Sequence, residues 1–213
     1  MATSTDREAV LRRLWKSDVP EGVSGAWAVE RFMIRRDPPP KERLEALPGD
    51  TEYAPSKRGT YTRLNHRGTV FMTDTQDEWV SHREVILQAA HRGGRVLVNG
   101  LGLGLVVEVM LRNPYRPVEH LTVIECSEDV IRLVGRHLAS RYGDRLEIVL
   151  ADAFAWQPPP GRRYSVVWHD LWPHPHPDNF PEMDRLEQRY DGLCDWQASW
   201  ARAYAESYFN TLS

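Results

Sequence analysis

The sequence has few cysteines, no excess of basic residues and no long apolar run, and each shortage excludes a class of protein. Its two cysteines among 213 residues cannot form a disulfide framework, and neither belongs to a CxxC pair. A formal net charge of −3 gives no overall basic field for nucleic acid or anionic membranes. These shortages predict a globular protein of a reducing, cytoplasmic compartment that has no nucleic acid or membrane as its partner.

The longest apolar stretch, residues 96–111, is interrupted by Asn99, by glycines and by Glu108, so it does not predict a membrane span. The N-terminal segment is amphipathic and charged and lacks the apolar core of a signal peptide. The length is ample for one domain with a small appendage. We expect an N-terminal extension of a helix, a strand and a β-hairpin over residues 1–74, followed by the main domain over residues 75–213.

The extension and its junction show local signals. Apolar spacing predicts a helix at 5–15, and partial alternation predicts a strand at 26–34. Two short strands flank the turn at 65–68, where Gly68 can adopt a positive φ. A helix should then run from Thr75 to His91, begun by a capping box of Thr75 and Glu78.

From residue 95 onward, strands and helices alternate. Continuous runs of Val, Ile and Leu predict strands, and helices of about a dozen residues separate them, with Ser127 capping the second helix. The expected strands are 95–100, 120–125, 145–152 and 162–170, and the expected helices are 104–113 and 127–143. The fold class is therefore α/β, with a Rossmann-like, doubly wound and mostly parallel sheet.

The C-terminal segment departs from this alternation. A proline-rich loop follows Asp170, and residues 183–193 and 194–210 have helical patterns. We expect Trp196 and Trp200, four residues apart, to pack one of these helices onto the sheet. The C-terminus is thus expected to be abbreviated and helical, which leaves a sheet edge that would suit a homodimer.

The stretch VLVNGLGLGL, residues 96–105, has the strand–turn–helix context of a nucleotide-binding loop. A GxGxxG dinucleotide fingerprint is excluded because Leu105 and Val107 stand where its third glycine would be. A phosphate-binding P-loop is excluded because no Lys-Ser/Thr pair follows. The remaining GxGxG pattern suits a nucleoside with an amino-acid tail better than a pyrophosphate.

Three acidic residues end successive strands, where parallel sheets bind ligands. These are Glu125, Asp152 and Asp170. A carboxylate at the second strand end can accept hydrogen bonds from both ribose hydroxyls, and one at the third strand end can accept from an adenine amino group. The registration of the acids with the glycine loop predicts a nucleoside site.

The runs VLVNGLGLGLVVEVML, VIECSEDVIRLV, LADAFAW and VVWHDLW resemble the class I S-adenosylmethionine-dependent methyltransferases, and within them the spermidine-synthase-like branch, over about residues 60–172. The resemblance implies S-adenosyl-L-methionine as the cofactor. It implies an acid where Asn99 stands, so we expect the amide of Asn99 to replace a charge by hydrogen bonding. The implied contacts are Gly100, Gly102 and Gly104 at the methionine end and ribose, Glu125 at the ribose, and Asp152 and Ala153 at the adenine. Cys126, beside Glu125, is a further expected cofactor-binding residue.

The resemblance further implies a methyltransferase acting on a small-molecule acceptor. Asp170 is expected to face the methyl donor and the substrate, and His169 beside it is a candidate general base because of its near-neutral pKa. A hydrogen-bonded wall position is the ordinary alternative for such a histidine. Trp172 is expected to line the substrate pocket. We predict no metal site, because His174 and His176 lie in an extended proline-rich segment.

Two other functions remain open. Aminopropyl transfer would use the decarboxylated cofactor, although polyamine recognition calls for a more acidic pocket than WHDLWPHPHPD offers. A non-catalytic nucleoside-binding protein with the same fold would agree with Asn99 and the short C-terminus. Nucleic-acid methylation is disfavoured by the net charge and by the absence of an Asn-Pro-Pro-Tyr-type motif after the fourth strand.

Overall fold

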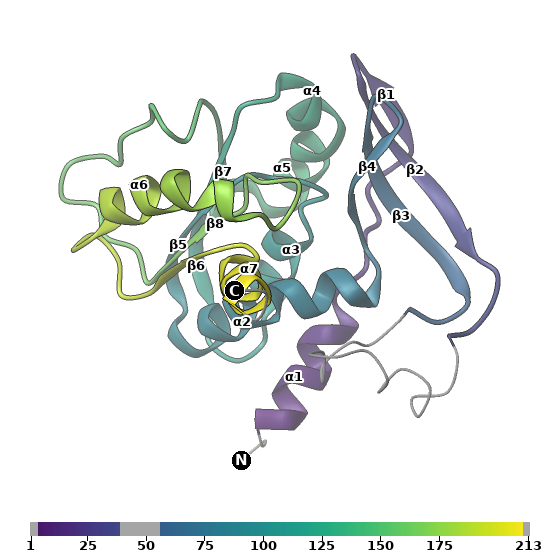
Figure 1. Ribbon diagram of the computed structural model, residues 1–213. Coiled ribbons are helices and arrows are strands. Elements are labelled where there is room, and N and C mark those ends of the chain that lie inside the picture. The colour runs from purple at the N-terminus through teal and green to yellow at the C-terminus, as the bar shows by residue number, and fades with distance from the viewer. Residues whose placement is uncertain (1–3, 39–55, 211–213) are drawn as a thin grey trace.

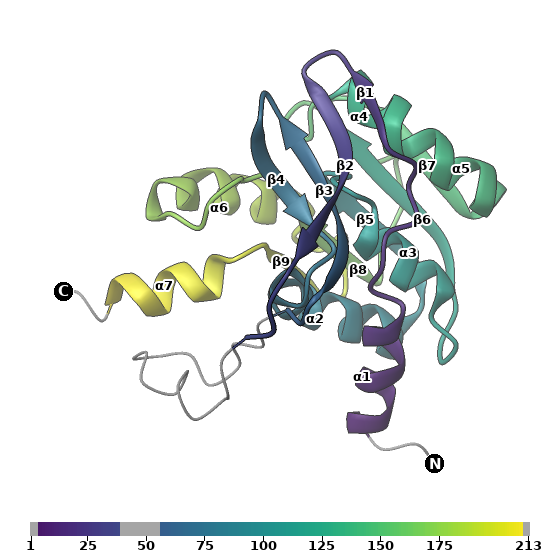
Figure 2. The same ribbon diagram turned by 90° about the vertical axis from the view of Figure 1, so that its right-hand side faces the viewer.

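The protein contains two β-sheets, described here from a computed structural model that covers residues 4–38 and 56–210. An antiparallel sheet of order β1-β2-β3-β4 comes first, and a parallel sheet of order β7-β6-β5-β8-β9 follows (Figure 1). The N-terminal sheet stands beside the parallel sheet in Figure 1 and in front of it in Figure 2. The helix α2 joins the two sheets in the chain. The Rossmann-like α/β fold class is thereby confirmed.

The N-terminal sheet contains the predicted hairpin. Its elements are α1 (Ser4–Arg13), β1 (Gly22–Ser24), β2 (Trp27–Ile34), β3 (Gly59–His66) and β4 (Thr69–Thr73). Between β3 and β4, Arg67 and Gly68 both have positive φ, 51° and 81°. This pair of angles is what a two-residue type I′ hairpin turn requires. The short strand β1 was not predicted.

Helix α2 (Gln76–Arg92) follows the N-terminal sheet, and it ends at Gly93, whose φ is 63°. Trp79 and Ile86 are buried in its interior face, as the sequence predicts. The predicted capping box is wrong, since the side chain of Thr75 makes no cap hydrogen bond. Its hydroxyl lies 2.7 Å from that of Thr73, so a neighbouring side chain occupies the group that would have capped the helix.

The parallel sheet confirms the predicted alternation of strands and helices. Its first part comprises β5 (Gly94–Asn99), α3 (Leu105–Arg112), β6 (Val118–Glu125), α4 (Glu128–Val130), a π-helical turn (Ile131–Gly135), α5 (Arg136–Tyr142), a 3-10 turn (Gly143–Arg145), β7 (Leu146–Leu150) and β8 (Val166–His169). The Ser127 hydroxyl accepts a hydrogen bond from the Val130 amide at 3.3 Å, which confirms the predicted cap.

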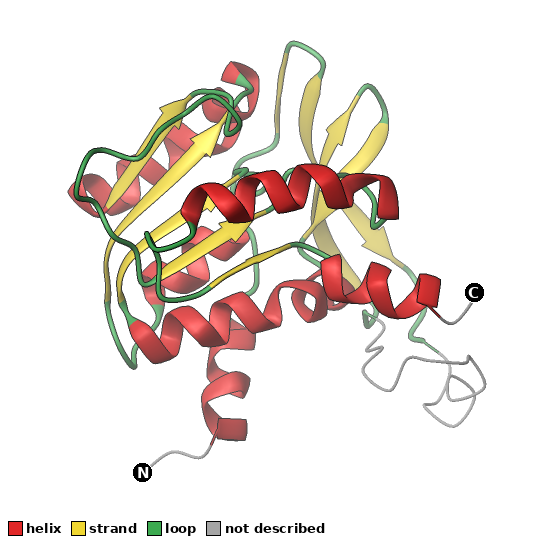
Figure 3. Ribbon diagram, turned by 60° about the vertical axis from the view of Figure 1, so that its left-hand side comes forward, coloured by secondary structure: helices red, strands yellow, loops and turns green. Residues whose placement is uncertain are grey.

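Helices cover both faces of this sheet (Figure 3). On β5, Val96 and Val98 belong to the large core that includes α2, α3 and α5. Leu97 belongs to a second core with Tyr190 of α6 (Phe180–Tyr190). Successive residues of a strand point to opposite faces, so β5 is buried on both sides and needs an apolar run.

The predicted continuous helix at 194–210 is wrong. Residues Gln197–Ser199 form β9, which pairs in parallel with β8, and α7 (Arg202–Asn210) begins only afterwards. A 3-10 turn (Pro177–Asn179) precedes α6. The amide of Trp200 also donates to the carbonyl of His169 at 2.8 Å. Pairing with β8 overrides the helical pattern because ladder hydrogen bonds satisfy this backbone.

No helix within the described ranges has the length and apolar character needed to cross a membrane.

Candidate functional site

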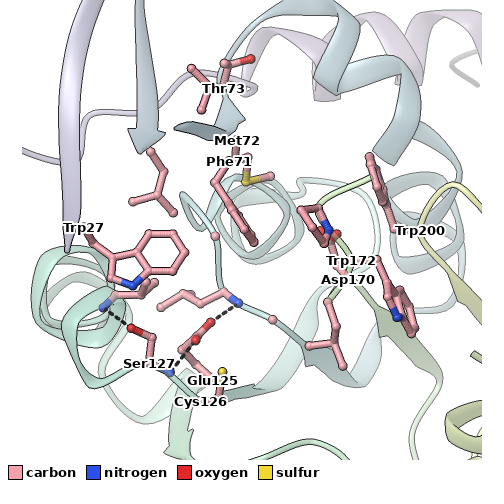
Figure 4. Close-up of a pocket in the computed structure, with 18 of the residues that line it drawn as sticks. Trp27, Phe71, Met72, Thr73, Glu125, Cys126, Ser127, Asp170, Trp172 and Trp200 are labelled. Atoms are coloured by element: carbon pink, nitrogen blue, oxygen red, sulfur yellow. Dashed lines mark hydrogen bonds between the residues drawn. The ribbon is translucent and has the colours of Figure 1, made fainter. Parts of the chain in front are cut away.

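A cavity of about 280 Å³ lies where the carboxyl ends of β5, β6 and β8 meet the N-terminal sheet (Figure 4). Both sheets contribute to its wall. The N-terminal sheet supplies Trp27, Leu64, Val70, Phe71, Met72 and Thr73, and the main domain supplies Gly100, Leu101, Gly102, Glu125, Cys126, Ser127 and Asp170 among others. Five of the predicted site residues are therefore brought together here: Gly100, Gly102, Glu125, Cys126 and Asp170.

Glu125 is fixed by the loops on either side of it. One carboxylate oxygen accepts from the Leu101 amide at 2.9 Å, and the other accepts from the Ser127 amide at 2.7 Å. Glu125 is only 8% exposed and still lines the cavity. A carboxylate oxygen has two lone pairs, so each keeps one acceptor site for a ligand hydroxyl. The glycine loop thus holds an oriented carboxylate at the cavity wall.

The three loop glycines are needed for contacts within the protein. All have positive φ: a Cβ on Gly100 would lie 2.1 Å from the Asp170 carbonyl oxygen, and one on Gly102 would lie 2.5 Å from the Met72 sulfur. A Cβ on Gly104 would meet the Leu138 side chain at 2.3 Å, and Gly104 is not among the described lining residues. Gly104 thus allows the close packing of α3 on α5, and its expected cofactor contact stays a prediction.

At the other end of the cavity, Asp170 is paired with a histidine that the sequence did not single out. Nε2 of His82 lies 2.9 Å from a carboxylate oxygen of Asp170, and Nδ1 lies 2.8 Å from the carbonyl oxygen of Glu78. His82 is buried, whereas the Asp170 side chain is 22% exposed. Asp170 therefore presents one face to the cavity and is oriented from behind by His82.

The charges in this cluster shift its pKa values. Burial, together with the charges of Asp170 and Asp77, raises the pKa of Glu78 to about 7 against the opposing effect of His82. Burial alone would lower the pKa of His82, but the charge of Asp170 and the hydrogen bond to it leave that pKa raised overall. The cavity wall therefore contains Asp170 and a glutamic acid, Glu78, that titrates near neutrality, and behind Asp170 lies a histidine that favours its protonated form.

Aromatic side chains enclose the cavity. Trp27 lies at the same end as Ser127, and Trp172 and Trp200 lie at the Asp170 end (Figure 4). Trp172 lines the cavity, as the sequence predicts. Its indole N–H donates a 2.9 Å hydrogen bond to the Glu182 carboxylate. Trp196 and Trp200 pack against the main core, as expected, although they flank β9 and do not lie in a helix. Trp200 also lines the cavity.

Two predicted site residues lie behind the cavity wall. Asn99 and His169 are fully buried, and the Asn99 amide nitrogen is 2.7 Å from His169 Nδ1. His169 also meets Gln197 at 3.4 Å and the Tyr190 ring at 5.4 Å. Both side chains therefore face α6, as Leu97 does, whereas Val98 faces the core of α2 and α3. Because side chains alternate between the two faces of a strand, the side chains of Asn99 and His169 point away from the cavity.

Asp152 and Ala153 follow β7, and neither is among the described lining residues. The Asp152 carboxylate is exposed and accepts from the Phe154 amide at 2.8 Å. It still acts on the site, because burial, Glu125 and Asp152 all raise the pKa of the Cys126 thiol. Cys126 is exposed and lines the cavity. The adenine contacts of Asp152 and Ala153 stay a prediction.

The buried His169 predicts an acid-sensitive fold. Burial lowers its pKa from 6.5 to about 4, so between these values the unfolded chain binds a proton that the folded chain does not. Its stabilising contribution is complete above pH 6.5 and is lost as the pH falls to 4, by about 3 kcal/mol. Urea unfolding across this range should give a shallower pH dependence for His169→Gln than for wild type. The exposed His91→Gln variant should follow wild type, and parallel profiles for all three would contradict the assignment.

Two residues of the cluster around Asp170 could not be identified from the sequence. His82 and Glu78 belong to an amphipathic helix pattern, and only the contact with Asp170 distinguishes them. No group of three or more His, Cys, Asp or Glu residues within the described part of the chain could hold a metal ion.

No family model matches the chain. In sequence it is similar to polyamine aminopropyltransferase 2 of Hyperthermus butylicus, with 33% identity over 91 residues, which are 40% of this chain and 29% of that protein. In structure it is similar to the methyltransferase CcbJ of Streptomyces caelestis, with a TM-score of 0.40 and 24% identity over 54% of this chain and 45% of the other. The 23S rRNA methyltransferase ErmE gives a TM-score of 0.41 and 17% identity over 55% and 44% of the two chains.

The sequence match spans less than a third of the aminopropyltransferase, and each structural match spans less than half of the other protein. The match nevertheless falls in the branch that the motifs indicate, and the order β7-β6-β5-β8-β9 is that of a Rossmann-like sheet. The chain resembles the class I methyltransferases and their spermidine-synthase-like branch, with a Rossmann-like sheet joined to an N-terminal antiparallel one.

Proposed function

We propose that this protein is an S-adenosylmethionine-dependent methyltransferase that acts on a small molecule. The observation that supports this most is the placement of Glu125 and Asp170 in the wall of one cavity, on either side of the glycine loop. Glu125 would bind the ribose of the cofactor, and Asp170 would face the acceptor. The aromatic walls would exclude water from the space between them.

The cavity residues fit the cofactor. Glu125 would accept hydrogen bonds from the ribose hydroxyls through its remaining lone pairs, and Gly100 and Gly102 would lie along the methionine end. The ionisable lining groups are Glu78, Glu125, Asp170 and Cys126, with no Lys or Arg among the described lining residues. When bound, the cofactor supplies a methyl group on a positively charged sulfonium, which this acidic surrounding favours.

Asp170 would bind the acceptor and take up its proton. Its carboxylate has an exposed face toward the cavity, and His82 fixes its orientation from the buried side. Positioning would supply most of the rate, since the methyl donor needs no further activation.

Aminopropyl transfer is a second candidate, and two observations favour it. One is the 33% identity with a polyamine aminopropyltransferase. The other is the acidic lining, because Glu78 and Asp170 come from distant parts of the chain and make the pocket more acidic than its sequence indicates. Both observations suit a polycationic acceptor and a cofactor without its carboxylate.

Calorimetry with three nucleosides tests these functions. We expect S-adenosylmethionine and S-adenosylhomocysteine to bind with micromolar affinity, and the decarboxylated donor to bind more weakly. Methyl transfer is then measured with methyl-labelled donor and a set of small amines. Tighter binding of the decarboxylated donor would assign aminopropyl transfer instead. Binding without any transfer would favour the non-catalytic protein, and no binding of any nucleoside would refute the site.

A further inference from the structure

A second cavity, of about 750 Å³, lies between α2, β9 and α7. Its volume is within the range of roughly 300 to 1,000 Å³ typical of small-molecule sites. The proposed methyl transfer does not use it.

The two cavities share a wall. Trp200 lines both, its indole nitrogen donates to the Ser81 hydroxyl at 3.2 Å, and its ring stacks 6.2 Å from the His82 ring. The second cavity therefore lies directly behind the Asp170 end of the first. A molecule that extends past Trp200 could reach both.

The free charges of the second cavity are negative. Asp77, Ser81 and Glu84 are spaced along one face of α2 and all line it. The two arginines in its wall are neutralised: Arg83 pairs with Glu8 at 2.7 Å, and Arg202 pairs with Asp184 and Glu206 among others. Asp77 and Glu84 have no ion pair within the residues that the structure describes. The surplus charge favours a cation.

Aromatic rings complete the wall. Trp168, Trp200 and Tyr204 all line the cavity. Trp168 is only 4% exposed, and its indole N–H has no hydrogen-bond partner among the described residues. Aromatic faces next to unpaired carboxylates are a surrounding that recognises organic ammonium groups.

We propose that the second cavity binds the distal part of the acceptor, a protonated amine on an aromatic body, while the reactive end reaches Asp170 past Trp200. This rests on the proposed function. Asp77 and Glu84 would hold the ammonium group, and the aromatic rings would hold the body. The two cavities would then select elongated amines over short ones.

Tryptamine is the probe for this site, with indole-3-propionate as its anionic counterpart of the same ring. In calorimetry of the full chain, tryptamine should bind with submillimolar affinity, and indole-3-propionate should not. The double variant Asp77→Asn/Glu84→Gln should weaken tryptamine binding at least tenfold. The matched variant Glu119→Gln, an exposed acid on β6, should bind like wild type.

Unchanged affinity in the double variant, equal binding of the anion or no binding of tryptamine would each overturn the proposal. S-adenosylhomocysteine, titrated into the same samples, distinguishes failure of the second-cavity proposal from failure of the proposed function. If it binds wild type and the double variant alike while tryptamine fails, the second cavity loses its role and the cofactor site stands. If tryptamine behaves as expected and the nucleoside does not bind, the proposed function fails and the acceptor role fails with it.

Discussion

Replacing Gly100 with alanine should lower the free energy of unfolding by about 3 kcal/mol or more. Gly100 has φ +98°, and a Cβ there would lie 2.1 Å from the Asp170 carbonyl oxygen. Both residues follow a strand directly and are held by backbone hydrogen bonds: the Gly100 amide donates to the Ile124 carbonyl oxygen and the Asp170 amide to the Asn99 carbonyl oxygen, each at 2.8 Å. The collision cannot be relieved by a side-chain rotation. Asp170 should move with the loop, and nucleoside binding should weaken as well.

Gly161→Ala is the matched control for this change. Gly161 also has positive φ, +75°, but nothing lies within 4 Å of the added Cβ. The free energy of unfolding of this variant should fall by only about 1 kcal/mol, which is the cost of placing alanine in a left-handed backbone conformation. Urea unfolding of both variants measures the difference. Equal losses would contradict the close approach of the glycine loop to Asp170.

Replacing Glu125 with glutamine should weaken S-adenosylhomocysteine binding about 100-fold, or about 2.7 kcal/mol. Glu125 accepts from Leu101 and Ser127 through different oxygens, whereas glutamine has only one acceptor oxygen. Its NH₂ group would face one of these amides, so the loop would shift and a ribose acceptor would be lost.

Calorimetry well below the unfolding temperature separates this loss from reduced stability. Glu119→Gln removes the same charge from an exposed site on the same strand and should leave affinity unchanged. Affinity of the Glu125 variant within threefold of wild type would show that the ribose is bound elsewhere.

Local patterns gave much of the fold correctly. The apolar runs of β5, β6, β7 and β8, the Ser127 cap and the turn at Arg67 and Gly68 depend on neighbours in the chain, and all are present. Strand β9 was missed because its residues have a helical pattern. Only the ladder to β8, which joins His169 to Ser199, makes them a strand.

The candidate site could also be predicted only in part. Glu125 and Asp170 could be located because parallel strands bring their carboxyl ends to one edge. The direction of each side chain was less predictable: Asn99 faces α6, although its neighbour Gly100 lines the cavity. Successive side chains of a strand point to opposite faces of the sheet. An error of one position in an expected contact therefore places the side chain on the wrong face.

The sequence by itself determined the parallel sheet, the hairpin and the strand-end acids, since these follow from periodicity and turn chemistry within short segments. The tertiary structure alone decided the pairing of His82 with Asp170, 88 residues apart, and the position of Trp200 between two cavities. Such contacts depend on how α2 and β9 pack around β8. No local pattern encodes that arrangement, because the same side chains would be compatible with an ordinary helix face and an ordinary core.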